Sequence, residues 1–213
     1  MARQAVATAV NNNRRAYWLR QLRQWHWISA AVSLLGTLMF AITGITLNHA
    51  GQIEAKPQVR IEERQLPQAL LDAAKTAKGE TGTPLPARLT AWLEDELSIK
   101  TTDTRPEWSN EEIYVSLPRP GGDAWVSVDR ETGAVRYEVT NRGWVSYLND
   151  LHKGRNTGFG WSLFIDGFAI ACIVFAATGL ALLQLYASNR PMTWPLVGFG
   201  CALPILIAMF LIH

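Results

Sequence analysis

The sequence has little cysteine, and neither of its two cysteines is placed for chemistry. Cys172 and Cys201 both lie in apolar runs, and no CxxC pair is present. A CxxC metal or redox site is therefore excluded. We interpret both thiols as small buried hydrophobic side chains, so the cysteine count does not indicate a redox compartment.

Several motifs of common enzyme classes are also missing. The sequence contains no P-loop, GxGxxG, HExxH or GxSxG pattern, so nothing in it indicates phosphoryl transfer, zinc hydrolysis or a serine nucleophile. The formal net charge is only +2 and no basic stripe is present. The electrostatic footprint of a nucleic-acid-binding protein is therefore absent, and we expect no nucleic-acid partner.

Charge is nearly absent from three long stretches of the chain. The first, Trp27 to Leu47, has 21 residues, and a helix of that length rises about 31 Å, enough to cross the hydrocarbon core of a bilayer. The second, 159–187, carries Asp166 as its only charge, and the third, 191–213, carries none. We therefore expect three membrane spans, the first of which is too long for a cleaved signal peptide.

The basic residues predict how these spans are oriented. Residues 1–24 hold five arginines and no acid, Arg190 follows the second span, and the segment 50–155 holds 17 acids and 14 bases. By the positive-inside rule, the N-terminus is cytoplasmic, whereas the central domain and the C-terminus are periplasmic in a bacterial inner membrane. The expected parts are a cytoplasmic segment 1–24, spans 25–49, 158–187 and 193–213, a periplasmic domain 50–150 and a cytoplasmic loop 188–192.

The central segment has the patterns of a small mixed domain. Residues 113–117, 125–128 and 135–139 alternate between apolar and polar side chains and are separated by glycine-containing turns, which predicts an antiparallel meander. Residues 66–75 are typical of a helix with proline in its first turn, and residues 89–97 fit either a short helix or a strand. The pattern as a whole predicts an α+β module.

The chain has four histidines, and three of them lie at expected span ends. His26 opens the first span, His49 closes it, His152 precedes the second span and His213 ends the chain. A neutral imidazole is a haem axial ligand, and His49 and His152 are expected at the same membrane face, where they could flank one haem. His26 precedes His49 by about 34 Å of helix, so it needs either a second haem whose other ligand comes from another chain, or a different role. An interfacial polar group is the simpler alternative for each of them.

Charged residues near these histidines could support a cofactor. Lys153 and Arg155 follow His152 and would suit anionic haem propionates, or they merely flank the membrane. Asp166 is costly inside a span and is expected to face the bundle interior. It could pair with Arg155, hydrogen-bond a ligating histidine, or pass protons.

Several segments resemble the PepSY-associated transmembrane family. They are Leu22 to Trp27 together with Thr43 and Gly44, Leu117 to Pro120, Val128 to Val135, and Leu151 to Arg155. The resemblance covers about residues 20–187. It implies a membrane α-helical fold with three transmembrane helices and a small periplasmic α+β PepSY-like domain.

The resemblance also implies a function, because larger members of this family include siderophore–iron reductases that carry haem b. It implies haem b ligated by His26, His49 and His152 in a small inner-membrane ferric reductase. Electrons would pass from quinol or a cytoplasmic reductant to periplasmic Fe(III) or a ferric chelate, and a homodimer would complete the haem sites.

Other functions stay open at this point. Asp150, Glu111 and Glu112 could hold ferric iron through their oxygens, or they form only a solvated surface. The chain could instead be a membrane-tethered PepSY module that regulates a protease or another partner. A third alternative is a cytochrome b subunit that passes electrons to a periplasmic redox protein.

Overall fold

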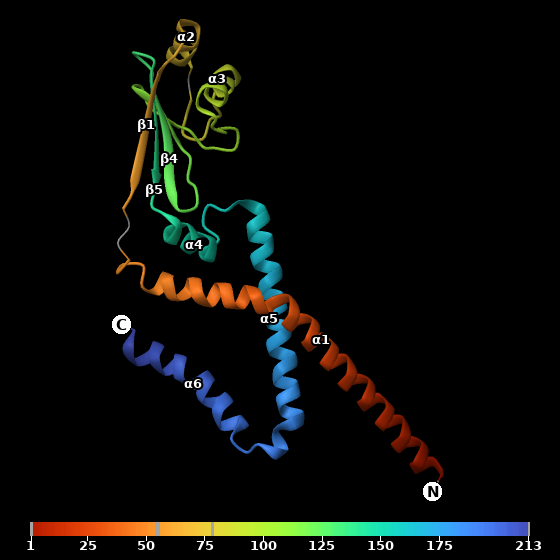
Figure 1. Ribbon diagram of the computed structural model, residues 1–213. Helices are drawn as coiled ribbons and strands as arrows, with labels where there is room; N and C mark the ends of the chain where they lie inside the picture. Colours follow the sequence, from red (N-terminus) through yellow and green to blue (C-terminus); the bar gives the residue numbers. More distant parts are fainter. Residues whose placement is uncertain (1, 54–55, 78, 213) are drawn as a thin grey trace. The chain divides into compact units, whose positions relative to one another are not determined.

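The computed structural model describes residues 2–53, 56–77 and 79–212, and their side chains except those of residues 2–12 and Asn189. His213 therefore lies outside the described residues. The chain divides into a helical unit, residues 1–39 and 164–213, and a sheet unit, residues 40–163. Figure 1 shows the elements of each unit.

Three helices are long and apolar enough to span a membrane. Helix α1 runs from Ala2 to Asn48, α5 from Gly158 to Tyr186 and α6 from Thr193 to Leu211, and a short 3-10 helix, η1 (Ala187–Asn189), follows α5. The spanning stretch of α1 begins at Asn13. Helices that are apolar on all sides are typical of lipid surroundings, so the expectation of three transmembrane helices is confirmed.

Small side chains line the α1 face that packs against α5 in the helical unit. Ser29 and Ser33 are buried, and each donates its hydroxyl hydrogen to a carbonyl one turn earlier in α1. Both buried hydroxyl groups therefore have a hydrogen-bond acceptor. A Cβ atom added at Gly36 would lie 2.5 Å from the Phe168 ring of α5. The two helices therefore approach closely because position 36 has no side chain.

The sheet unit contains a five-stranded antiparallel sheet in the order β1-β5-β4-β3-β2. Its strands are β1 (Gln58–Gln65), β2 (Glu107–Trp108), β3 (Glu112–Ser116), β4 (Gly122–Asp129) and β5 (Ala134–Asn141). The three strands predicted from alternation correspond to β3, β4 and β5. Strands β1 and β2 were not anticipated.

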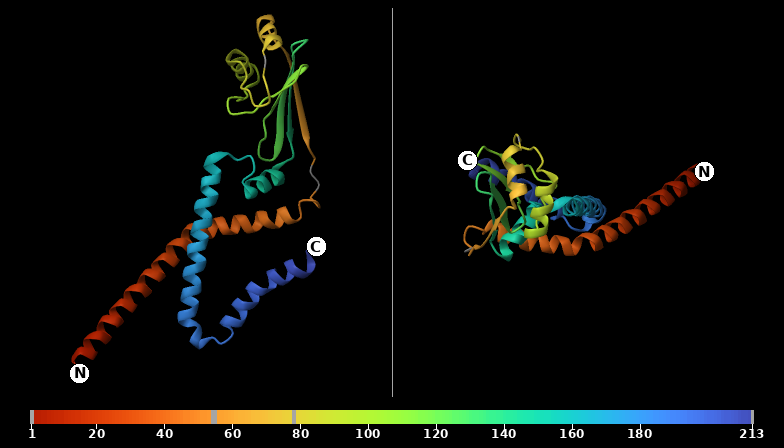
Figure 2. Two further views of the ribbon diagram at one scale, coloured as in Figure 1. Left: turned by 180° about the vertical axis from the view of Figure 1, so that it is seen from behind. Right: turned by 90° about the horizontal axis from the view of Figure 1, so that it is seen from above.

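Two helices cover one face of this sheet (Figures 1 and 2). Helix α2 runs from Gln68 to Thr76 and α3 from Ala87 to Leu97, so the predicted helix is confirmed and the undecided segment is helical. Each begins after a proline, whose fixed φ suits a helix start. Their leucines pack on the inward side chains of β3, β4 and β5, and the largest fully buried ones are Leu89, Leu93, Ile113, Val115, Val126, Val128 and Val135.

One further helix, α4 (Trp144–Lys153), connects the sheet to α5. The turn between β3 and β4 fixes its position. Gly121 has a φ of +76°, and a Cβ atom there would lie 2.8 Å from the Tyr147 side chain. Only glycine adopts this backbone conformation easily, so the turn sits directly against α4. The sequence did not predict α4, and it carries His152.

Candidate functional site

His26 of α1 is held by three neighbouring residues of α5, all within the helical unit. Its ring stacks on Phe175, with centroids 4.8 Å apart and planes 14° from parallel. Its Nδ1 atom lies 3.0 Å from Thr178 Oγ1 and 3.2 Å from the Phe175 carbonyl oxygen. A Cβ atom added at Gly179 would lie 3.2 Å from His26 Cε1, so the ring fits because Gly179 has no side chain.

These contacts determine which ring nitrogen of His26 carries the proton. A carbonyl oxygen can only accept, and the Thr178 hydroxyl already donates to the Val174 carbonyl at 2.6 Å. Nδ1 must therefore be the donor, so in the neutral ring Nε2 keeps its lone pair. A histidine that is hydrogen-bonded at Nδ1 and open at Nε2 is oriented as a metal ligand.

His152 of α4 has the same surroundings, all within the sheet unit. Its Nδ1 atom lies 2.7 Å from Thr43 Oγ1, and the Thr43 hydroxyl donates to the Phe40 carbonyl at 3.2 Å. Its ring lies against the Phe40 ring, with centroids 5.1 Å apart. A Cβ atom at Gly44 would be 3.5 Å from Cε1. His152 therefore also donates from Nδ1 and keeps the lone pair on Nε2.

The two sites use one short sequence pattern twice. Phe40–Gly44 reads Phe-Ala-Ile-Thr-Gly and Phe175–Gly179 reads Phe-Ala-Ala-Thr-Gly. In both, the phenylalanine contacts the imidazole, the threonine accepts from Nδ1 and the glycine lies beside Cε1. We call each arrangement a histidine cradle. Sequence reasoning missed the Thr178 cradle, although the repeated Phe-Ala-x-Thr-Gly pattern was a usable signal.

His49 is placed differently from the other two histidines. It follows the last residue of α1, is exposed, and lies with Nδ1 3.0 Å from the Ile45 carbonyl oxygen of its own helix. It also donates from Nδ1, which leaves the lone pair on Nε2. Among the described residues, no hydrogen bond or ring contact joins His49 to His152, so their sharing of one haem stays a prediction.

The charged residues after His152 have separate roles. Lys153 is exposed, but Arg155 pairs with Asp150 at 2.6 Å. The second carboxylate oxygen of Asp150 accepts the Gly121 backbone N–H at 2.8 Å, and Asp150 is only 2% exposed. Asp150 is therefore a buried structural carboxylate that connects α4 to the β3–β4 turn. The exposed iron-holding role considered for it is wrong.

The other acidic candidates are exposed. Asp166 lies on the exposed side of α5, and within the part of the chain that the structure describes it has no hydrogen bond or ion pair. It does not face the interior of the helical unit, contrary to expectation. Glu111 and Glu112 lie at the start of β3, and the Glu112 carboxylate accepts the Ser127 hydroxyl hydrogen.

The donor set suits a transition metal that prefers nitrogen ligands. In its neutral form each of the three imidazoles presents an Nε2 lone pair, and imidazole ligands bind iron, copper, nickel and zinc. Within the described residues, no group of three or more His, Cys, Asp or Glu side chains lies together as a metal site. Two of the three are fixed by cradles, so their rings lose little freedom when a ligand bond forms. Imidazole is also the side chain that would hold the iron of a haem, and the threonine and phenylalanine of each cradle fix the orientation of its ring.

Comparisons with known proteins identify one match. The family model described as PepSY_TM-like matches residues 17–213. This range includes both cradles, His49 and the whole sheet unit. No curated protein and no solved structure shows significant similarity to the chain.

Proposed function

Because the chain belongs to the PepSY_TM-like family, we propose that it is an inner-membrane b-type haem protein that reduces periplasmic Fe(III) to Fe(II) for iron uptake. The observation that carries the proposal is the duplicated cradle. Two histidines are each fixed at Nδ1 by a threonine of a membrane-spanning helix. Chance interfacial histidines would not be expected to share one arrangement.

Bound haem would supply a one-electron redox centre of the kind that reduces ferric iron. The residues of the chain would bind and orient it. Thr43 and Thr178 keep the proton on Nδ1, so that each Nε2 lone pair would be available to bind the iron. Phe40 and Phe175 flank the rings and exclude water from that side.

Each cradle would supply one histidine to the haem iron, and a low-spin b-type site needs two such ligands. His49 is the remaining described histidine with a lone pair on Nε2, so it would complete one site. A second copy of the chain would complete another, which is why the proposal includes a homodimer. Lys153 is the exposed cation that remains beside His152 for a propionate, since Arg155 already neutralises Asp150.

The test is an absorption spectrum of the full chain purified in mild detergent, oxidised and then reduced with dithionite. We expect a sharp Soret band and resolved α and β bands on reduction. His26→Ala and His152→Ala should each lower the haem content per chain, whereas His213→Ala serves as the matched control and should not. Adding Fe(III) to the reduced protein should reoxidise the haem.

Two results would contradict the proposal in different ways. A protein that stays colourless after haem reconstitution would exclude the redox function and favour a membrane-tethered regulatory module. A haem protein that is not reoxidised by Fe(III) would instead favour a cytochrome b subunit serving another periplasmic redox protein. Orientation is tested separately, by the accessibility of a cysteine introduced at Lys75 in a cysteine-free background.

A further inference from the structure

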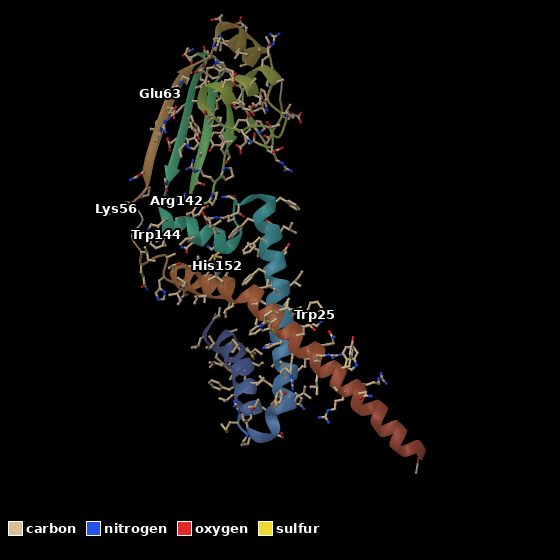
Figure 3. All side chains as sticks on the ribbon, turned by 45° about the vertical axis from the view of Figure 1, so that its right-hand side comes forward. Trp25, Lys56, Glu63, Arg142, Trp144 and His152 are labelled. Carbon is tan, nitrogen blue, oxygen red and sulfur yellow. The ribbon has the colours of Figure 1, made fainter. Side chains whose placement is uncertain are left out.

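A cavity of about 520 Å³ lies in the sheet unit beside the first turn of α4. Figure 3 shows three of its side chains, Lys56, Arg142 and Trp144, close together at this end of the helix. Ile53 and Asn149 complete the part of the lining used here. None of these residues belongs to a histidine cradle.

The side chains of this cavity present hydrogen-bond donors. Lys56 is exposed and has no ion-pair partner within the described ranges. Arg142 pairs with Asp123 through one nitrogen, and its guanidinium has further N–H groups. Asn149 is only 8% exposed, and its Oδ1 accepts the Thr46 hydroxyl hydrogen. The Thr46 hydroxyl also donates to the Thr43 carbonyl at 2.9 Å, so the contact with Thr46 occupies the Asn149 amide, which adds no free donor to the cavity.

The backbone at the start of α4 adds more donors. Gly143 precedes the helix without a side-chain cap, and the first intrahelical bond runs from Tyr147 N to the Gly143 carbonyl. The three intervening N–H groups have no partner in the part of the chain described, and they belong to Trp144, Val145 and Ser146. Uncapped N–H groups at a helix start attract anions. Two cations, Lys56 and Arg142, therefore line the same cavity as these N–H groups.

The cavity is lined by residues that lie a few positions from the ends of two candidate membrane spans, since Ala50 and Ile53 follow α1 and α4 precedes α5. Helix α4 ends at Lys153, and α5 begins at Gly158. The buried side of α4 contacts Thr43 and Thr46, which belong to the apolar run of α1. Trp144 is 70% exposed, as expected for an aromatic side chain at the level of lipid headgroups.

We propose that this cavity binds the phosphate group of a membrane phospholipid, with a preference for anionic headgroups. The N–H groups of α4, Lys56 and Arg142 surround the phosphate oxygens. Trp144 and Ile53 contact the glycerol and the upper acyl chain. The site is independent of the proposed haem chemistry, because it involves no cradle residue.

The experiment is native mass spectrometry of the full chain in detergent, titrated separately with phosphatidylglycerol, phosphatidylcholine and inorganic phosphate. We expect phosphatidylglycerol to bind most tightly. Lys56→Gln should weaken it about fivefold, the effect of one lysine near an anionic lipid surface. Arg142→Gln should weaken it further, and Lys75→Gln, the same charge change on α2, should change binding by less than about twofold.

Three outcomes would overturn the proposal. Equal lipid binding by Lys56→Gln and the unchanged chain would exclude the cavity. An equal loss in Lys75→Gln would indicate diffuse attraction to the whole unit. Binding of inorganic phosphate without phosphatidylglycerol would make the site one for a free anion. Arg142→Gln also breaks the pair with Asp123, so Lys56→Gln, whose side chain supports no described contact, decides the result.

Discussion

Replacing Asp150 tests how the sheet unit holds the helix that carries His152. One carboxylate oxygen of Asp150 accepts the buried Gly121 N–H, and the other accepts from Arg155. Asp150→Ala removes both bonds. Asp150→Asn keeps an acceptor for Gly121 but removes the charge. Arg155→Ala removes the cation, whose side chain is 54% exposed.

The geometry predicts a different loss in the free energy of unfolding for each of these three substitutions. An unpaired buried N–H costs about 1–3 kcal/mol, and the half-exposed ion pair adds about 0.5–1 kcal/mol. Asp150→Ala should therefore lower the free energy of unfolding by about 2–4 kcal/mol. Asp150→Asn keeps the bond to Gly121, and in Arg155→Ala water replaces the exposed guanidinium. Each of these two substitutions should therefore lower the free energy of unfolding by only about 1 kcal/mol.

The assay is pulse proteolysis of the full chain in detergent across a urea gradient, which reports the fraction of the sheet unit that is unfolded. The reasoning fails if Asp150→Asn is as costly as Asp150→Ala, since the charge would then matter more than the Gly121 bond. It also fails if Arg155→Ala is the most costly of the three. A shifted α4 should also lower haem content in Asp150→Ala, because His152 lies on that helix.

Three further predictions address the cradles, the helix pair and acid stability. Thr43→Val and Thr178→Val keep the side-chain shape but lose the hydroxyl, so each should speed haem transfer to apomyoglobin about tenfold. Gly36→Ala places a Cβ atom 2.5 Å from Phe168 and should destabilise the helical unit by about 1–3 kcal/mol in thermal melts. Hydrogen bonds from the backbone and side chain of Thr132 hold the pKa of Asp129 below its usual value. Its contribution to stability is therefore present above the ordinary aspartate pKa of about 3.9 and is lost as the pH falls through the lower, folded value.

Each of these predictions has a matched control. Thr37→Val removes a threonine hydroxyl from α1 outside both cradles, and it should leave haem transfer unchanged. Gly167→Ala adds a methyl group where no atom lies within 4 Å, and it should not lower stability. Asp129→Asn should flatten the loss of stability as the pH falls below the ordinary aspartate pKa of about 3.9. An unchanged acid profile in this variant would assign that loss to other carboxylates.

The strands were predictable where one face of the sheet is buried, and not elsewhere. Alternation identified β3, β4 and β5 because their inward side chains are apolar. In β1, the residues that share the inward face are Arg60, Glu62 and Arg64, which pair with Val139, Tyr137 and Val135. The more apolar Val59 and Ile61 point the other way and are exposed. Because the inward side chains of β1 are polar, its alternating pattern does not identify a face that packs on the core.

The sequence alone suggests the candidate ligands, whereas the residues that hold them become visible only in the fold. Histidines at span ends stand out because a charge there is costly, which identified His26, His49 and His152. The protonated nitrogen of each ring depends on hydroxyls from another helix, such as Thr178 for His26, and only the fold brings these together. The environment of Asp150 was equally unpredictable from the sequence. Only the fold shows that the loop at Gly121 buries this carboxylate and gives it a structural role.

The register of β1 with β5 determines whether the sheet can be separated from the helices of this protein. After α1 the chain enters the sheet at Gln58, and it leaves the sheet for α4 after Asn141. Gln58 and Asn141 are Cα partners in the β1–β5 ladder. Neighbouring Cα atoms across an antiparallel pair are about 5 Å apart. In topological terms, residues 58–141 are an insertion whose two ends a short turn could join. The module could therefore be excised, exchanged for a relative or grafted elsewhere, leaving α1, α4 and the His152 cradle on one continuous shortened chain.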